Sequence, residues 1–304
     1  MQVAEVTAYG GPEVLRLAER PDPSPAPGEV VVRIRAATVN PTDVSLRAGA
    51  HRAAASLQPP FVPGWDLAGE VTAVGGDVDR YRPGDRVVGM IPFGRIGGRV
   101  GAYAQAAAVD PDWLAPLAGD IDDPTGATLP LNALTARQAL DLMDLPPEST
   151  LLVTGASGAV GGFAVQLAAR DGCRVIAQAS TDDEDWVASL GATGVLPRST
   201  DLATIGPVDA VLDAVPLGLT STACLRDGGI AVFTRPPGAE PDRDLRFETV
   251  LVQTDPEALG ALTTDLLEGR LRTRIAEVLP LAEAARAHEL NEAGGLRGKV
   301  VLAP

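Results

Sequence analysis

The chain has 304 residues, enough for about two domains, and 45% of them are hydrophobic, so a sizeable core can form. Its formal net charge of −15 disfavours nonspecific binding to nucleic acid or to an anionic membrane. No apolar run reaches the roughly 18 residues of a membrane span, and residues 1–6 lack the features of a secretion signal. We therefore expect a cytoplasmic protein with a small-molecule substrate, no nucleic acid and no membrane partner.

Lysine and cysteine are scarce in this chain, and this limits the kinds of catalytic and metal sites that it can form. Lys299 is the only lysine, which excludes a Walker A loop and the Tyr-x-x-x-Lys pair of short-chain dehydrogenases. Cys173 and Cys224 have no metal-ligand spacing, so we expect ordinary buried thiols.

The first part of the chain is rich in short strands. Residues 29–37, 64–74 and 86–90 have strand character and are separated by Pro and Gly turns, which predicts a β-rich, partly closed barrel. Residues 122–142 follow as a pair of helices.

The stretch 151–170 has the order of a dinucleotide-binding unit. An apolar strand passes through a turn of small residues into a helix, with the pattern A-x-G-x-x-G. Gly158 would let the backbone approach a cofactor diphosphate, and Gly161 would let helix and strand pack closely. The residues predicted to line the cofactor here are Ala156, Ser157, Gly158, Ala159, Val160 and Gly161.

Strands and helices then alternate as in a parallel, doubly wound sheet. The predicted strands are 173–179, 194–196, 208–215 and 229–233, with a helix at 184–190.

Short motifs along the whole chain carry a family resemblance. They are Gly-Gly-Pro-Glu-Val-Leu at 10–15, Asn-Pro-Thr-Asp at 40–43, Pro-Gly-Trp-Asp-Leu-Ala-Gly at 63–69, Pro-Gly-Asp-Arg-Val at 83–87, Gly-Ala-Tyr-Ala-Gln at 101–105 and Gly-Lys-Val-Val at 298–301. With the turn at 155–161, they resemble the zinc-independent quinone oxidoreductase branch of the medium-chain dehydrogenase/reductase superfamily. The resemblance implies an α/β protein with a GroES-like β-rich catalytic domain and a Rossmann domain with a doubly wound parallel sheet. The catalytic domain would comprise residues 1–121 and 255–304, and the Rossmann domain residues 122–254.

Zinc-bearing relatives carry a cysteine near Thr42 and a His-Glu pair where Trp65 and Asp66 stand. Tryptophan cannot ligate zinc, and neither Thr42 nor Asp66 completes a tetrahedral site of nitrogen and sulfur ligands. We therefore expect no metal. Hydride transfer from C4 of a nicotinamide then suits acceptors that polarise themselves, such as quinones and enones.

The resemblance implies roles for three residues of the catalytic domain. Asn40 would hold a substrate carbonyl or a ribose hydroxyl, and Asp43 would anchor the loop, although both also suit a cap for a helix beginning at Pro41. His51 stands where relatives often have tyrosine and is a candidate proton donor, with a solvated loop residue as the alternative. His288, beside Glu289, is expected at the surface.

The resemblance also places Thr135 at the nicotinamide end of the cofactor, and Ala214 and Val215 against its ring; ordinary packing is the alternative. The second strand is followed by Ser180 and Thr181 instead of an acid, which favours NADP over NAD. The acids at 182–185 would repel a 2′-phosphate unless they face solvent as a first helical turn. Arg198 would compensate, so we predict NADP, with NAD possible.

The sequence thus predicts an NADPH-dependent reductase of quinones or activated C=C bonds. The competing function is an NADPH-binding sensor or scaffold without turnover. We also expect a homodimer, formed through the apolar edge segment 247–253.

Overall fold

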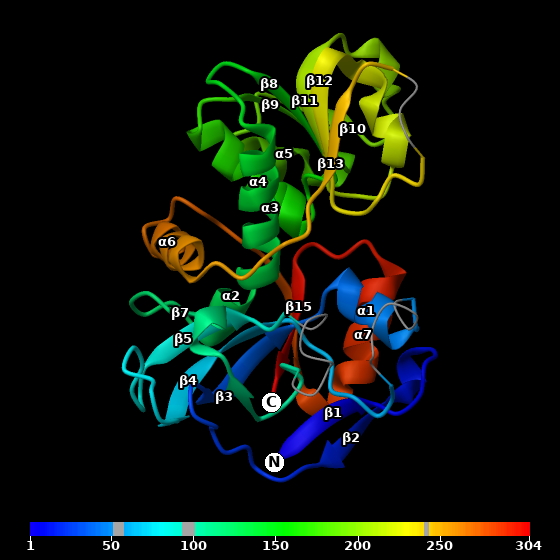
Figure 1. Ribbon diagram of the computed structural model, residues 1–304. Helices are drawn as coiled ribbons and strands as arrows, with labels where there is room; N and C mark the ends of the chain where they lie inside the picture. The colour runs from blue at the N-terminus through cyan, green and yellow to red at the C-terminus, as the bar shows by residue number, and fades with distance from the viewer. Residues whose placement is uncertain (51–57, 93–100, 240–242) are drawn as a thin grey trace. The chain divides into compact units, whose positions relative to one another are not determined.

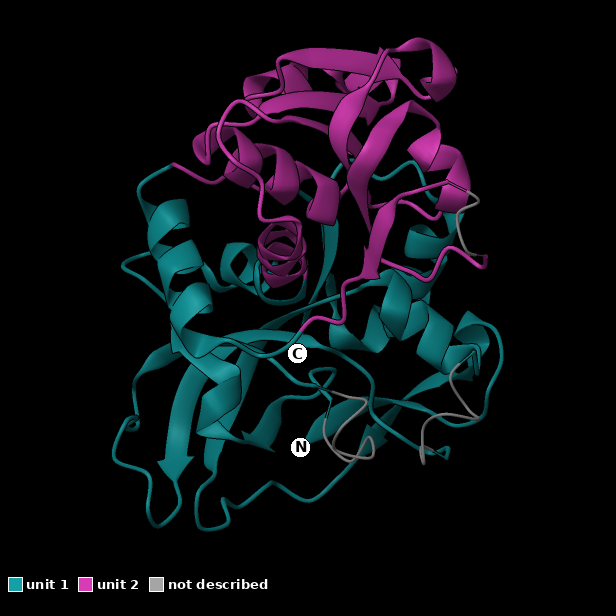
Figure 2. Ribbon diagram, turned by 45° about the horizontal axis from the view of Figure 1, so that its top comes forward, with its two compact units in different colours: residues 1–131, 253–269, 274–304 teal, residues 132–252, 270–273 magenta. Residues whose placement is uncertain are grey.

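The computed structural model describes residues 1–50, 58–92, 101–239 and 243–304 (Figure 1). The chain divides into two compact units (Figure 2). Unit 1 comprises residues 1–131, 253–269 and 274–304, and unit 2 comprises residues 132–252 and 270–273. Both ends of the chain therefore belong to unit 1, and its middle forms unit 2.

Unit 1 is built mainly on antiparallel strands, which confirms the predicted β-rich domain. A seven-stranded sheet has the order β14-β15-β3-β4-β5-β7, with β6 also paired to β3, and β1 and β2 form a separate pair. The strands are β1 (Gln2–Val6), β2 (Leu15–Glu19), β3 (Val30–Thr38), β4 (Asp66–Val74), β5 (Arg86–Met90), β6 (Ala106–Val109), β7 (Leu114–Pro116), β14 (Ile275–Pro280) and β15 (Lys299–Ala303).

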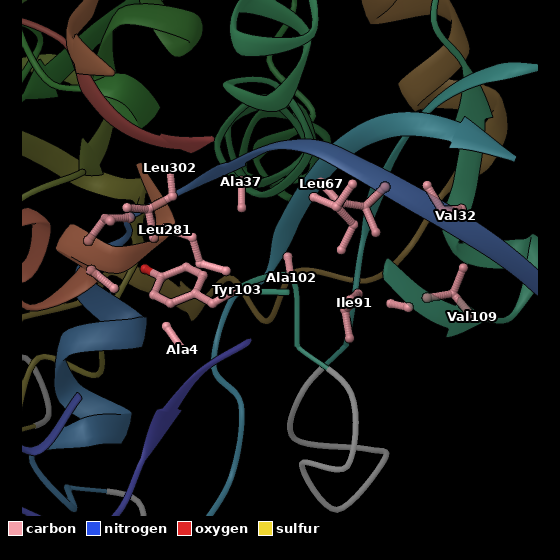
Figure 3. Close-up of a cluster of buried hydrophobic side chains, with 14 of the residues drawn as sticks. Ala4, Val32, Ala37, Leu67, Ile91, Ala102, Tyr103, Val109, Leu281 and Leu302 are labelled. Carbon is pink, nitrogen blue, oxygen red and sulfur yellow. The ribbon is translucent and has the colours of Figure 1, made fainter. Parts of the chain in front are cut away.

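Strand β3 shows how the sequence pattern creates the core of unit 1. Val30, Val32 and Ile34 alternate with the exposed Arg33 and Arg35, so one face of the strand is buried and the other meets water. The buried face joins apolar side chains from the neighbouring strands and loops, among them Leu67, Tyr103 and Leu302 (Figure 3).

The α-helices in the described part of unit 1 are α1 (Pro41–Arg47), α2 (Asp123–Ala127), α6 (Pro256–Leu267) and α7 (Ala284–Ala293). A 3-10 turn at Leu281–Glu283 immediately precedes α7. No helix in the described ranges combines the length and the apolar character needed to span a membrane.

Unit 2 is a Rossmann domain with a six-stranded parallel sheet. The strands are β8 (Thr150–Thr154), β9 (Arg174–Ala179), β10 (Gly194–Pro197), β11 (Val208–Asp213), β12 (Leu225–Phe233) and β13 (Arg246–Thr249). Their spatial order is β10-β9-β8-β11-β12-β13, and each neighbouring pair is parallel. Counted from β8, this is the doubly wound order 3-2-1-4-5-6, whose ligands bind where the order reverses.

The helices α3 (Pro130–Met143), α4 (Ala159–Arg170) and α5 (Glu184–Ser189) belong to the same alternation of strand and helix. Strand β13 is shorter than the apolar segment 247–253 suggests, since it ends at Thr249. It pairs only with β12 among the described strands, so it forms the edge of the sheet.

Candidate active site

The loop between β8 and α4 has the geometry of a phosphate-binding turn. Gly155 adopts a left-handed conformation with φ of 61°, and a Cβ built on Gly161 would lie 2.4 Å from the carbonyl oxygen of Gly155. The helix can approach the strand this closely only because Gly161 has no side chain. Gly158 is the exposed N-cap of α4, where the helix offers backbone N–H groups to an anion. The turn therefore fits a dinucleotide diphosphate.

Four neighbouring parallel strands end beside this turn. Because β10, β9, β8 and β11 run in the same direction, their carboxyl ends share one edge of the sheet. Val215 packs on the turn, since a Cβ on Gly155 would lie 2.5 Å from its Cγ1. The remaining predicted cofactor residues of these strands follow their ends: Ser180 and Thr181 after β9, Arg198 after β10, and Ala214 after β11.

Arg198 brings a positive charge to this edge. Its Nη2 donates to Ser157 Oγ at 3.4 Å, so the guanidinium lies against the turn. Of the four acids at 182–185, only Asp183 is buried. Asp182 is exposed in the 3-10 turn before α5, and Glu184 and Asp185 are exposed in the first turn of α5. Exposed carboxylates in the first turn of a helix are stabilised by the helix dipole. Their position there is thus explained without a contact to the cofactor.

A buried carboxylate joins the two strands at the switch point. Asp213, at the end of β11, accepts from Thr154 Oγ1 at 2.7 Å and from the backbone N–H of Gly218 at 2.8 Å. Burial raises the pKa of Asp213, and these hydrogen bonds oppose the rise. These bonds fix the loop that carries Ala214 and Val215.

In unit 1, Asp43 ties a helix to a turn. It is the third residue of α1, and its carboxylate accepts from the backbone N–H of Asn40 at 2.9 Å, as in a capping box. The other carboxylate oxygen accepts from the N–H of Gly64 at 3.1 Å. Asp43 thus holds the start of α1 against the turn at Gly64.

Asn40 lies at the centre of a buried polar network. Its Nδ2 donates to Asp66 Oδ2 at 2.8 Å and to Thr38 Oγ1 at 3.4 Å, while its Oδ1 accepts from Lys299 Nζ at 2.6 Å. Both amide hydrogens are thereby used, so Asn40 holds protein groups together here and offers no free donor. Direct contact of Asn40 or Asp43 with substrate stays a prediction, and the capping alternative matches the contacts seen.

Burial shifts the pKa values of the ionisable groups in this network. Burial raises the pKa of Asp43 to about 7, opposed chiefly by the hydrogen bond from Asn40. Burial likewise raises the pKa of Asp66, and it lowers the pKa of Lys299 to about 8 while the two carboxylates oppose that fall.

Comparison with known proteins agrees with this architecture. The family model of the alcohol dehydrogenase GroES-like domain matches residues 26–119, and that of a zinc-binding dehydrogenase matches residues 190–302. A chloroplastic quinone oxidoreductase of Triphysaria versicolor is 31% identical over 328 aligned positions, covering 100% of this chain and 98% of the relative. The chain belongs to the quinone oxidoreductase branch of the medium-chain dehydrogenase/reductase superfamily. It is an oxidoreductase.

Two further relatives support the assignment. An NADPH-dependent alkenal/one oxidoreductase of Arabidopsis thaliana is 30% identical and covers 97% of this chain and 78% of its own length. The solved structure of a quinone oxidoreductase from Coxiella burnetii superimposes with a TM-score of 0.91 at 30% identity, covering 100% of this chain and 99% of that one.

In this oxidoreductase, the residues at the zinc position of metal-bearing relatives are not suited to bind a metal ion. Trp65 has no ligand atom, and the Asp66 carboxylate already accepts from Thr38, Asn40 and Leu131. Across the described ranges, no three His, Cys, Asp or Glu side chains form a group able to hold a metal ion.

The structure tests the prediction for one of the two histidines of the oxidoreductase. His51 lies outside the described residues. The expectation that His288 is a surface residue is wrong: the side chain is fully buried, with Nε2 3.1 Å from Tyr103 Oη. Burial, with help from Arg47, lowers the pKa of His288 to about 3, so it is neutral at physiological pH. The next residue, Glu289, is polar. In a short helix with many polar residues, the sequence alone does not indicate which side chains are buried against the rest of the protein.

Proposed function

We propose that this oxidoreductase transfers hydride from NADPH to quinones or to activated C=C bonds such as enones, and that it does so without zinc. The observation that supports this most is the turn with Arg198 at the switch point of the sheet. Relatives named for quinone reduction and for alkenal/one reduction point to the same class of acceptor.

Bound NADPH would supply the hydride from C4 of its nicotinamide. The residues of the chain would bind the cofactor and orient it. Gly158 and the first turn of α4 would receive the diphosphate, and Arg198 the 2′-phosphate. Thr135, which is 8% exposed on α3, would reach the nicotinamide end together with Ala214 and Val215. A quinone or enone carries its own electron-withdrawing carbonyl, so the reaction needs no Lewis acid.

The deciding experiment follows NADPH oxidation at about 340 nm with a benzoquinone and a panel of enones. Turnover with either class supports a reductase. NADPH binding, measured by fluorescence, with no turnover on any acceptor would favour the sensor or scaffold function instead.

We predict that activity is independent of zinc. Purified protein should contain no stoichiometric metal and should keep its activity after treatment with a chelator, because Trp65 and Asp66 do not form a zinc site. Metal analysis that finds one zinc per chain, together with loss of activity to the chelator, would contradict this.

Arg198→Ala should weaken NADPH binding by about tenfold or more and leave NADH binding nearly unchanged. A charge-assisted bond to the 2′-phosphate is worth more than a neutral one, and NADH has no such phosphate. Arg174→Ala is the matched control, since Arg174 is an exposed arginine at the start of β9, away from the turn. Equal losses for both cofactors in Arg198→Ala would show that Arg198 does not read the phosphate.

We predict a homodimer formed through the edge strand β13. Its free edge has no strand partner among the described residues, and Phe247 and the nearby Leu251 are 38% and 76% exposed. Sedimentation at micromolar concentration should show a dimer that Phe247→Glu dissociates and Leu17→Glu, on unit 1, does not. A wild-type monomer would contradict the pairing.

The two cysteines are buried free thiols, as is usual in a reducing compartment, which supports a cytoplasmic location.

A further inference from the structure

The only lysine of the chain is buried. Lys299 begins β15 and is 7% exposed, and its Nζ donates to the carbonyl oxygen of Val39 at 2.7 Å and to Asn40 Oδ1 at 2.6 Å. Lysines are rarely buried unless they are paired, because the ammonium loses its hydration. Here its hydrogen-bond partners are neutral oxygens, and the nearest carboxylates are reached through Asn40.

The ammonium fixes which way the amide of Asn40 faces. Lys299 needs an acceptor and the Asp66 carboxylate needs donors, so only one orientation of the amide serves both. Reversing the amide would set an N–H₂ group against the ammonium and an oxygen against the carboxylate. Lys299 therefore reinforces the orientation in which Asp66 Oδ2 receives a hydrogen bond from Asn40.

The second oxygen of Asp66 continues the chain of contacts. Asp66 Oδ1 accepts from the backbone N–H of Leu131 at 2.7 Å. Leu131 is the second residue of α3, where a carboxylate satisfies a free N–H and is favoured by the helix dipole. One turn further along the same helix lies Thr135, the residue assigned to the nicotinamide end. A continuous path of hydrogen bonds thus joins β15 to the start of the helix that carries Thr135.

We propose that Lys299 is a positioning residue for hydride transfer: by orienting Asn40 it sets the carboxylate of Asp66, which holds the start of α3 and so the placement of Thr135. This inference rests on the proposed reductase function. Apolar side chains of similar volume can replace a buried ionic cluster without loss of stability, so a purely architectural role does not require a lysine. A role in orienting Asn40 does require a lysine, because it depends on a hydrogen-bond donor to Asn40 Oδ1.

The kinetic test is Lys299→Met, which keeps most of the length of the side chain and removes its donors. We expect kcat to fall by roughly 10²-fold, since small misplacements of reacting groups cost about that much. Affinity for a cofactor fragment that lacks the nicotinamide should stay within about twofold, because the turn at Gly158 is untouched. Val301→Ala is the matched control: it removes a buried apolar group from the same strand, and should lower stability while leaving kcat unchanged.

A second measurement uses the wild-type protein and the fact that it has one lysine. Lysine labelled with ¹³C at Cε gives one side-chain signal, whose titration reports Lys299 alone. We expect a pKa near the value of about 8 that burial produces, and a change in the signal when NADPH saturates the protein. A signal that titrates near the ordinary lysine value and ignores NADPH would overturn the positioning role, as would unchanged kcat in Lys299→Met. Absence of turnover in wild-type protein whose lysine signal responds to NADPH would contradict the reductase function and leave the placement of Lys299 supported.

Discussion

Gly161→Ala is expected to lower the free energy of unfolding by about 1–3 kcal/mol, and Gly162→Ala to leave it unchanged or raise it by about 0.5–1 kcal/mol. The two glycines are neighbours, both buried in α4. A Cβ on Gly161 would lie 2.4 Å from the oxygen and 2.8 Å from the carbon of the Gly155 carbonyl, which are backbone atoms that cannot rotate away. On Gly162 the closest atoms would be 3.5 Å and 3.6 Å away, which is ordinary contact.

Gly161→Ala should also weaken NADPH binding, because relief of the clash moves the start of α4 away from the turn. Urea unfolding and an NADPH titration of the two variants measure both effects. The glycine next to it provides the control for helix propensity and burial alone. If the two variants lose stability to the same degree, the close approach of helix and strand is not what requires Gly161.

The sequence predicts best the elements whose ends are determined locally. Helix α6 runs over Pro256–Leu267 because the Asp255 side chain accepts from the N–H of Ala258 at 2.9 Å at its start, and Gly269 adopts a left-handed conformation just after its end. The close approach at Gly161 belongs to the same class, since the carbonyl group that its missing side chain avoids is that of Gly155 in the same turn.

The network around Asn40 could not be predicted in the same way. Lys299 and Asn40 are 259 residues apart, and His288 and Tyr103 are 185 apart. Nothing in the local pattern around Lys299 distinguishes a buried ammonium from an exposed one. Asp66 is similar: a carboxylate after Trp65 resembles a remnant of a metal site until its three donors are known. Which polar side chains share a core depends on the packing of distant segments, which periodicity does not encode.

Asp43→Asn should change how stability depends on pH. The folded-state pKa of Asp43, about 7, lies above its ordinary value of 3.8, so the folded chain binds this proton more tightly than the unfolded chain does. The stability contributed by Asp43 is then fully present below pH about 4 and is lost as pH rises through about 7. The difference in unfolding free energy between wild type and Asp43→Asn should fall across this window, with a limiting slope on the order of 1.4 kcal/mol per pH unit, and then level off. Urea unfolding of both proteins at several values between pH 4 and pH 8 measures it. A difference that grows with pH would mean that the pKa is lowered and that the carboxylate is stabilised by its two N–H donors.

The same variant tests the source of the proton that follows the hydride. A pKa of about 7 would let Asp43 carry a proton at neutral pH, yet its side chain is fully buried and its two oxygens face the N–H groups of Asn40 and Gly64. We therefore expect the proton to come from solvent or His51, and Asp43→Asn to keep most of the wild-type kcat. Any loss should follow the loss of folded protein. A collapse of kcat by about 10²-fold or more, with folding and NADPH binding intact, would make Asp43 the general acid, because that is the size of effect a removed acid produces.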